Sequence, residues 1–269
     1  MKITELRRPF ICGTLWDTDR DSAVRTIRLA ELDGADAFEL NLLGLGKIDV
    51  ESLKDIISST SKPMFTTNRR RDGWGRRFEG SEEQRMEVQL KAFDAGTAGF
   101  DMEIDTFDPG SGPMEFTEKK AAVEKQMRLI EDVRSRGGEI MISCHKHDSV
   151  FTVENALRIG TTIEQRGANM AKIIGRGLSY DDLIETLRAN LALREKLKIP
   201  FIHFSMGEYA KLSRTVGAML GSMLVYAQQE LHAKGFLWHQ PVIRNARQIL
   251  SNIDFVPTLA ARETRLGMR

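Results

Sequence analysis

Short apolar runs alternate with longer amphipathic stretches along almost the whole chain. The apolar runs are rich in β-branched and aromatic residues and are about five to eight residues long, which is typical of buried β-strands. We predict strands at residues 10–16, 37–43, 63–68, 100–105, 139–146, 170–176, 201–206 and 222–227.

The stretches between these runs repeat their apolar positions at helical spacing. We predict helices at residues 23–32, 51–57, 83–93, 118–133, 152–166, 180–197, 209–219 and 243–252. Glycines follow several of these stretches, where a left-handed residue commonly ends a helix. These glycines are Gly34, Gly96, Gly137, Gly138 and Gly167.

Eight strand–helix repeats predict an α/β protein. The strands are too continuously apolar for burial on one face only, which favours a parallel sheet covered by helices. Eight units in 269 residues fit a closed (β/α)₈ TIM barrel best, with a doubly wound open sheet as the second option. We predict one catalytic barrel domain over residues 1–254, followed by a loose basic tail over residues 255–269.

Charge and composition exclude several classes of partner. Lys and Arg number 39 against 38 for Asp and Glu, a net charge of +1, so there is no electrostatic basis for binding nucleic acid or a membrane surface. No apolar run approaches the roughly 18–20 residues of a membrane span, and the N-terminal stretch lacks a signal-peptide core. Cys12 and Cys144 make neither a disulfide framework nor a zinc site. We therefore expect a cytoplasmic protein.

In a barrel of this kind, the active groups lie where the strands end and in the loops that follow. The polar residues at these positions are more numerous than a purely structural barrel needs. They are Glu39, Asn41, Thr66, Asn68, Glu103, Asp105, His145, His147, Lys172, Arg176 and Ser205.

Lys172 lies in the middle of a short apolar strand, between Ala171 and Ile173. Burial disfavours the ammonium form, so desolvation would lower the pKa of the lysine and leave a neutral amine able to attack a carbonyl carbon. The alternatives are a lysine paired with a neighbouring carboxylate, or one whose head reaches water. The local sequence supports these alternatives equally.

Three other residues are candidates for chemistry. His145 and His147 are two apart on one strand and so point to the same face, and a histidine near a strand end can transfer protons near neutral pH. One of them could instead be structural, or the pair could bind a metal, although no third ligand has a recognisable spacing. Arg214 begins the helix after the seventh strand, where its planar fork suits a carboxylate; a plain surface arginine is the alternative.

Several of these segments resemble the type I 3-dehydroquinate dehydratases, Schiff-base-forming barrel enzymes. The resemblance runs over roughly residues 8–252 and rests on five separate places whose spacing and strand position agree. They are Asp101-Met102-Glu103, Ser143-Cys144-His145, the Gly167–Ile173 strand with Lys172, Ser205-Met206-Gly207 followed by Ser213-Arg214 and Gly217, and Gln240.

The resemblance implies a mechanism without a metal or cofactor. Lys172 would form a covalent imine with a small-molecule keto-acid, and His145 would act as general acid and base. Glu103, Glu39 and Asp72 would orient or tune His145 and Lys172. Arg214 would hold the substrate carboxylate and Gln240 would close over the ring, with Asn41, Asn68, Ser205 and His147 as further substrate contacts. Barrels of this kind often pair, so a homodimer is expected.

The chain also departs from the family pattern. Asn41 and Asn68 replace arginines, and Asp72 stands where a glutamate is usual. The segment 236–240 lacks the serine expected four residues before Gln240. The family's His-Asp pair occurs at His147, at the wrong spacing from the Ser-x-His strand, so we favour His145 over His147 as the acid and base.

Three functions compete on this basis. The first is the conversion of 3-dehydroquinate to 3-dehydroshikimate. The second is the same imine chemistry in a lyase or aldolase acting on a different keto-acid or sugar acid, which the changes at Asn41, Asn68 and Asp72 favour. The third is a non-catalytic barrel that binds a shikimate-like ligand.

Overall fold

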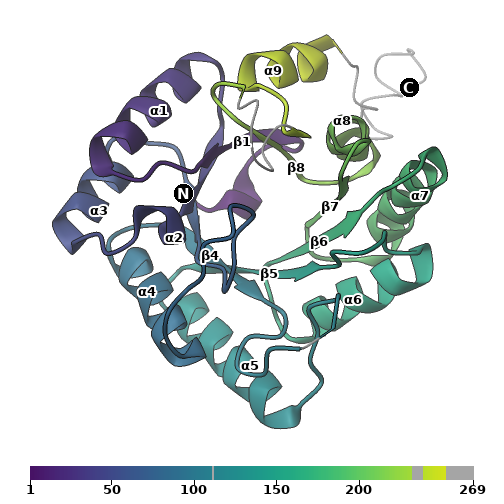
Figure 1. Ribbon diagram of the computed structural model, residues 1–269, viewed down its shortest axis with the longest axis horizontal. Helices are drawn as coiled ribbons and strands as arrows, with labels where there is room; N and C mark the ends of the chain where they lie inside the picture. The colour runs from purple at the N-terminus through teal and green to yellow at the C-terminus, as the bar shows by residue number, and fades with distance from the viewer. Residues whose placement is uncertain (111, 232–238, 253–269) are drawn as a thin grey trace, which may run out of the picture.

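Eight parallel strands form a nearly closed barrel, as predicted (Figure 1). The computed structural model describes residues 1–110, 112–231 and 239–252. The strand order is β7-β6-β5-β4-β3-β2-β1-β8, with β1 between β2 and β8. The strands are β1 Phe10–Leu15, β2 Ala37–Asn41, β3 Met64–Thr67, β4 Gly99–Glu103, β5 Glu139–His145, β6 Met170–Arg176, β7 Phe201–Met206 and β8 Leu224–Ala227.

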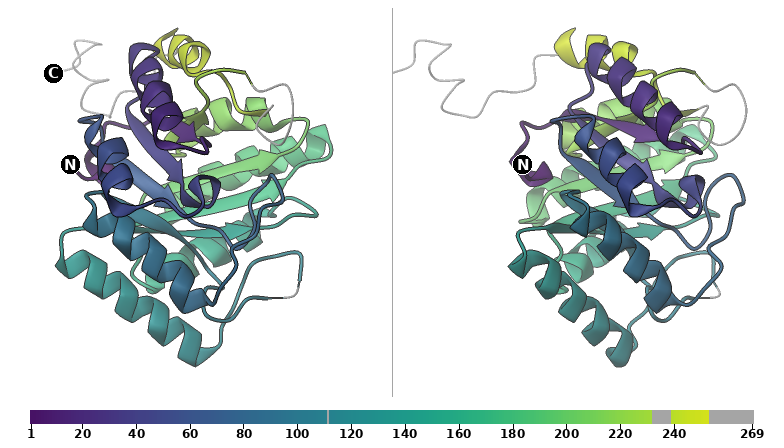
Figure 2. Two further views of the ribbon diagram at one scale, coloured as in Figure 1. Left: turned by 60° about the vertical axis from the view of Figure 1, so that its left-hand side comes forward. Right: turned by 90° about the vertical axis from the view of Figure 1, so that its left-hand side faces the viewer.

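Helices surround the strands on the outside of the barrel (Figures 1 and 2). They are α1 Arg20–Leu32, α2 Leu42–Leu45, α3 Val50–Ser58, α4 Glu82–Asp94, α5 Lys120–Ser135, α6 Val153–Gln165, α7 Tyr180–Lys196, α8 Ala210–Leu220 and α9 Ile243–Asn252. Each helix predicted from sequence is present within a few residues. The short helix α2 and the 3₁₀ helix Ile3–Glu5 were not predicted. Helix α2 has four residues and the 3₁₀ helix has three, and segments of this length are too short to show a helical repeat of apolar positions.

The alternation of side chains along each strand separates two sets of contacts. One set packs against the helices, as Ile140 and Ile142 of β5 do with residues of α5 and α6. The other set fills the barrel interior, where Met141, Met170 and Phe65 belong to one buried cluster. Because Lys172 follows Met170 by two positions, its side chain points into the same interior.

Glycine is required at the start of β4, where two backbones approach closely. A Cβ added at Gly99 would lie 1.7 Å from the carbonyl oxygen of Glu139, its neighbour in the β4–β5 ladder. We expect Gly99→Ala to lower the free energy of unfolding by about 3 kcal/mol, measured by urea denaturation. Gly112→Ala is the control, since the described residues place no atom within 4 Å of its added Cβ. Equal stability of the two variants would contradict the expectation.

Two predicted segments lie outside the described residues. These are the tail over residues 255–269 and most of the segment 236–240 that precedes Gln240. Within the described ranges, no helix combines the length and the apolar character needed to cross a membrane.

Candidate active site

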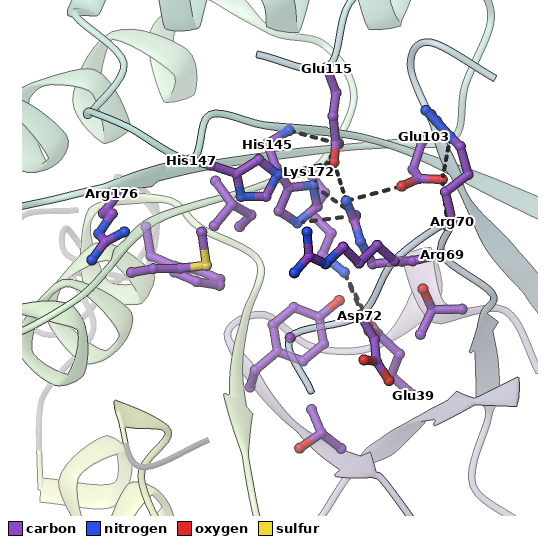
Figure 3. A pocket seen from close by; sticks show the side chains of 18 of the residues that line it. Glu39, Arg69, Arg70, Asp72, Glu103, Glu115, His145, His147, Lys172 and Arg176 are labelled. Carbon is purple, nitrogen blue, oxygen red and sulfur yellow. Dashed lines mark hydrogen bonds and ion pairs between the residues drawn. The ribbon is translucent and has the colours of Figure 1, made fainter. Parts of the chain in front are cut away.

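A cavity of about 1170 Å³ opens at the C-terminal ends of the strands (Figure 3). This is the end of a barrel where chemistry is expected. The residues that line it include most of those singled out in the sequence, namely Glu39, Asp72, Glu103, His145, His147, Lys172, Arg176, Arg214 and Gln240. The strand ends therefore bring together side chains that are far apart in the chain.

Lys172 projects from β6 into the cavity and forms two ion pairs. Its Nζ lies 2.9 Å from Asp101 Oδ2 on β4 and 3.2 Å from Glu39 Oε2 on β2. The same Nζ lies 4.8 Å from the centre of the Tyr226 ring on β8. The amine is thus held by three strands other than its own, and it is buried.

The resting amine of Lys172 is paired and protonated rather than uncharged. Burial lowers the pKa of Lys172, but the carboxylates of Asp101 and Glu39 together raise it by more, so the net pKa lies above the ordinary value. The structure shows the alternative left open by the sequence, a lysine paired with neighbouring carboxylates. A proton must therefore leave this amine before it can attack a carbonyl carbon.

His145 ends β5 and is buried, whereas His147 is half-exposed. The side chain of His145 is 11% exposed and that of His147 is 57% exposed. Nδ1 of His145 lies 2.9 Å from Glu115 Oε2 and 2.8 Å from Arg69 Nη1. Burial and Arg69 lower the pKa of His145 to about 4 although Glu115 raises it, so the ring is neutral at pH 7 and free to accept a proton.

Arg214 on α8 offers an anion site. Its guanidinium carbon lies 3.8 Å from the centre of the Phe204 ring, and burial lowers its pKa to about 9. Its Nε and Nη1 atoms have no hydrogen-bond partner in the described part of the chain. Buried donors without a partner are costly, so a bound carboxylate would satisfy them.

Gln240 lies beside the cavity at the end of β8. Its Oε1 accepts a hydrogen bond of 2.7 Å from Thr14 Oγ1, and its backbone carbonyl accepts one of 2.9 Å from Gln228 Nε2. These bonds hold the residue at the cavity wall.

Glu103 and Asp72 are engaged differently from the prediction. Glu103 pairs with Arg69 at 3.0 Å and with Arg85 at 2.8 Å, rather than with His145 or Lys172. Asp72 Oδ2 accepts from Arg76 Nε at 2.6 Å, and its Oδ1 accepts from the backbone N–H of Arg76 at 3.0 Å. Neither carboxylate orients the histidine or the lysine directly.

Three predicted substrate contacts do not reach the cavity wall. Asn41 caps helix α2 by accepting from the Gly44 N–H at 3.3 Å. Asn68 Nδ2 donates to the Arg85 carbonyl oxygen at 3.4 Å, and Ser205 Oγ is hydrogen bonded to the Thr186 hydroxyl at 2.5 Å. Because these side chains are hydrogen bonded to other parts of the protein and do not line the cavity, we leave Asn41, Asn68 and Ser205 out of the proposed site.

Four residues of the site were not among the sequence candidates: Arg69, Asp101, Glu115 and Tyr226. Asp101 and Tyr226 could have been found, since both belong to strands and point inward with their neighbours. Arg69 belongs to a run of three arginines that is evident in the sequence, but its side chain is oriented by ion pairs with Glu103 and Glu115. Glu115 lies in a loop, where no period predicts which side chain turns toward the barrel.

Comparison with known proteins agrees with this fold. The sequence model of the family described as Type I 3-dehydroquinase matches residues 11–256. A 3-dehydroquinate dehydratase of Aromatoleum aromaticum is 25% identical over 251 residues, 91% of this chain and 90% of that protein. Another, of Desulfotalea psychrophila, is 27% identical over 194 residues, 72% of this chain and 76% of that protein.

Solved structures show the same fold. The crystal structure of 3-dehydroquinate dehydratase from Geobacillus kaustophilus HTA426 superposes with a TM-score of 0.77 at 20% identity, and covers 93% of this chain and 95% of that chain. Within the described residues, no group of three or more His, Cys, Asp or Glu side chains has an arrangement that could hold a metal ion.

Proposed function

The chain belongs to the type I 3-dehydroquinase family, and from this we propose that it is a carbon–oxygen lyase that removes water from 3-dehydroquinate to give 3-dehydroshikimate. One observation carries the proposal. The buried amine of Lys172 lies in one cavity with a neutral, buried His145 and with Arg214, whose Nε and Nη1 lack a hydrogen-bond partner among the described residues. An amine, a base and a carboxylate site are the groups that imine-based dehydration of a keto-acid requires.

The ion pairs of Lys172 suit an imine as well as an ammonium. The amine gives one proton to Glu39 or Asp101, which lie 3.2 and 2.9 Å away, and then adds to the ketone carbon. Loss of water from the adduct gives a protonated imine, whose positive charge occupies the place of the ammonium charge. The same carboxylates then stabilise the iminium, so they favour the intermediate rather than only the resting state.

The protonated imine on Lys172 withdraws electrons from the adjacent carbon and so makes the elimination possible. The iminium acidifies the hydrogen on the adjacent carbon, and neutral His145 accepts that proton as an enamine forms. The enamine expels the β-hydroxyl group, and the imidazolium of His145 donates the proton with which it leaves as water. Hydrolysis of the product imine consumes one water and restores Lys172, so one molecule of water is released overall.

Binding is assigned to Arg214 and Gln240. The unpartnered Nε and Nη1 of Arg214 can donate to a carboxylate, and Gln240 lies at the wall where it can contact a ring hydroxyl. No cofactor is needed, because the imine nitrogen itself withdraws the electrons. A homodimer, expected from the resemblance, stays a prediction.

A second candidate is the same imine chemistry on a more anionic keto-acid. Arg71, Arg77 and Arg176 line the exposed mouth of the cavity, and no carboxylate partner for their side chains is present in the described ranges. Asn41 and Asn68 leave the floor without the arginines that the family usually has there. Together these features shift positive charge from the floor to the mouth.

The direct test is to add 3-dehydroquinate and follow ultraviolet absorbance. We expect an increase, because the product contains a conjugated enone and the substrate does not. Covalent trapping by borohydride without this increase would favour the second candidate. Binding with neither trapping nor absorbance change would contradict both and leave a ligand-binding barrel.

A further inference from the structure

The loop between β4 and α5 runs beside the end of β5 as an added antiparallel segment. The backbone N–H of Glu115 donates to the carbonyl oxygen of His145 at 3.0 Å, and that of His147 donates to the carbonyl oxygen of Pro113 at 3.1 Å. This register places Glu115 directly opposite His145, and Figure 3 shows its carboxylate turned toward the histidine.

The carboxylate of Glu115 holds His145 at two points. Oε2 accepts from the backbone N–H of His145 at 3.0 Å and lies 2.9 Å from Nδ1 of its ring. Burial raises the pKa of Glu115, but Arg69 and His145 lower it by more, so the carboxyl is ionised. An ionised carboxylate only accepts hydrogen bonds. We assign the hydrogen of His145 to Nδ1, from which it is donated to Glu115, and the lone pair to Nε2.

The guanidinium of Arg69 closes another side of the same ring. Its Nη2 pairs with Glu103 at 3.0 Å and also with Glu115. Its Nη1 lies 2.8 Å from Nδ1 and 3.4 Å from Nε2 of His145. With the hydrogen on Nδ1, the 2.8 Å contact of Nη1 with that atom is a contact between two donors, and Nε2 at 3.4 Å is the ring nitrogen that can accept from Arg69. A fixed positive charge thus lies beside the nitrogen that would take the substrate proton.

The base of the loop is clamped to the barrel by Arg166. Its Nη1 donates to the Ile104 carbonyl oxygen at 2.6 Å and to Gln126 Oε1 at 2.7 Å, and its Nη2 donates to the Thr117 carbonyl oxygen at 2.5 Å. Arg166 is buried. Glu115 is therefore held in place by the loop itself, before any ligand binds.

We propose that Glu115 and Arg69, rather than Asp72, are the positioning residues of His145 and set its tautomer and its strength as base and acid. Asp72 occupies the place of the family's usual acid but is bound to Arg76 within its own loop. The proposal rests on the proposed function only in treating Nε2 of His145 as the base.

The two residues act in opposite directions on the charge of the ring. Arg69 disfavours the imidazolium, as do burial and Lys172, whereas Glu115 favours it. His147 is the remaining titratable neighbour; its ring is stacked on that of His145 at 6.0 Å. A weakly basic His145 is neutral over most of the pH range and, once protonated, is a strong acid toward a departing hydroxyl.

The test is nitrogen-15 NMR of the histidine rings in the substrate-free protein. The chain has five histidines, so His145→Gln identifies the signal. We expect the wild-type ring to be protonated at Nδ1 and unprotonated at Nε2 at pH 7, with a pKa of about 4. A wild-type ring protonated at Nε2 instead would overturn the proposal without any variant.

Variants of Arg69 and Glu115 test the direction in which each residue shifts the pKa of His145. Arg69→Gln should move the pKa of His145 up toward the ordinary value of about 6.5, and Arg69→Lys, which keeps the charge, should restore most of the original titration. Glu115→Gln should move the pKa down and lose the single tautomer. The acid limb of kcat/KM should shift in the same two directions.

Asp72→Asn is the matched control, because it removes the acid at the family position. It should leave the tautomer and titration of His145 unchanged. If Asp72→Asn shifts them, or Glu115→Gln does not, the assignment is wrong. These titrations need no turnover, so their result is independent of whether 3-dehydroquinate is the substrate.

Discussion

Replacing Lys172 with arginine is expected to lower kcat with 3-dehydroquinate by on the order of 10⁴-fold to 10⁶-fold and to abolish covalent trapping by borohydride. Arginine keeps a positive charge between Asp101 and Glu39, but a guanidinium does not form an imine with a ketone under these conditions. The substitution therefore separates the covalent role of the amine from its part in two buried ion pairs.

The measurement is turnover together with mass spectrometry of the protein after borohydride treatment. Lys172→Ala is a less clean comparison, because it leaves two buried carboxylates without their cation and would cost stability. Circular dichroism checks that each variant is folded, and exposed Lys196 on α7 provides the control Lys196→Arg. An adduct that persists in Lys172→Arg, or turnover near the wild-type rate, would refute the imine mechanism.

The barrel was predictable because its signal is local. Each strand shows a short apolar run and each long helix shows a 3.6-residue period, and eight such repeats leave few topologies. The glycine ends were also predictable, since Gly34, Gly96, Gly137 and Gly167 adopt the left-handed φ values that favour glycine. Helix α2 was missed because the predicted strand continued through Leu42 and Leu43, which are as apolar as the strand before them.

The charge of Lys172 was not predictable from its strand. The apolar neighbours Ala171 and Ile173 point outward to the helices, so they say little about the interior that surrounds the amine. Its partners, Asp101 and Glu39, come from strands that are 71 and 133 residues away in the chain. A pattern along one strand shows which way a side chain points but not what it meets across a barrel.

The same reasoning applies to the acid that positions the histidine. Resemblance made Asp72 a candidate for this role together with Glu103 and Glu39, but one methylene fewer than glutamate and a bond to Arg76 keep the Asp72 carboxylate in its own loop. In our proposal Glu115 takes this role from another loop, where it is aligned by backbone hydrogen bonds that no side-chain pattern reveals.

His145→Gln is expected to lower kcat by about 10²-fold to 10⁴-fold while borohydride trapping on Lys172 persists. The glutamine keeps a side chain of similar reach but cannot take and return a proton, so the imine forms and the elimination stalls. His147→Gln should cost less than about tenfold, because the side chain of His147 is 57% exposed and lies at the edge of the site, where it pairs with Glu115 and stacks on the ring of His145. Single-turnover kinetics with intact-mass detection distinguish the two steps. A larger loss of kcat in His147→Gln than in His145→Gln would show that His147 is the acid and base. The substrate proton would then be removed from the side of His147.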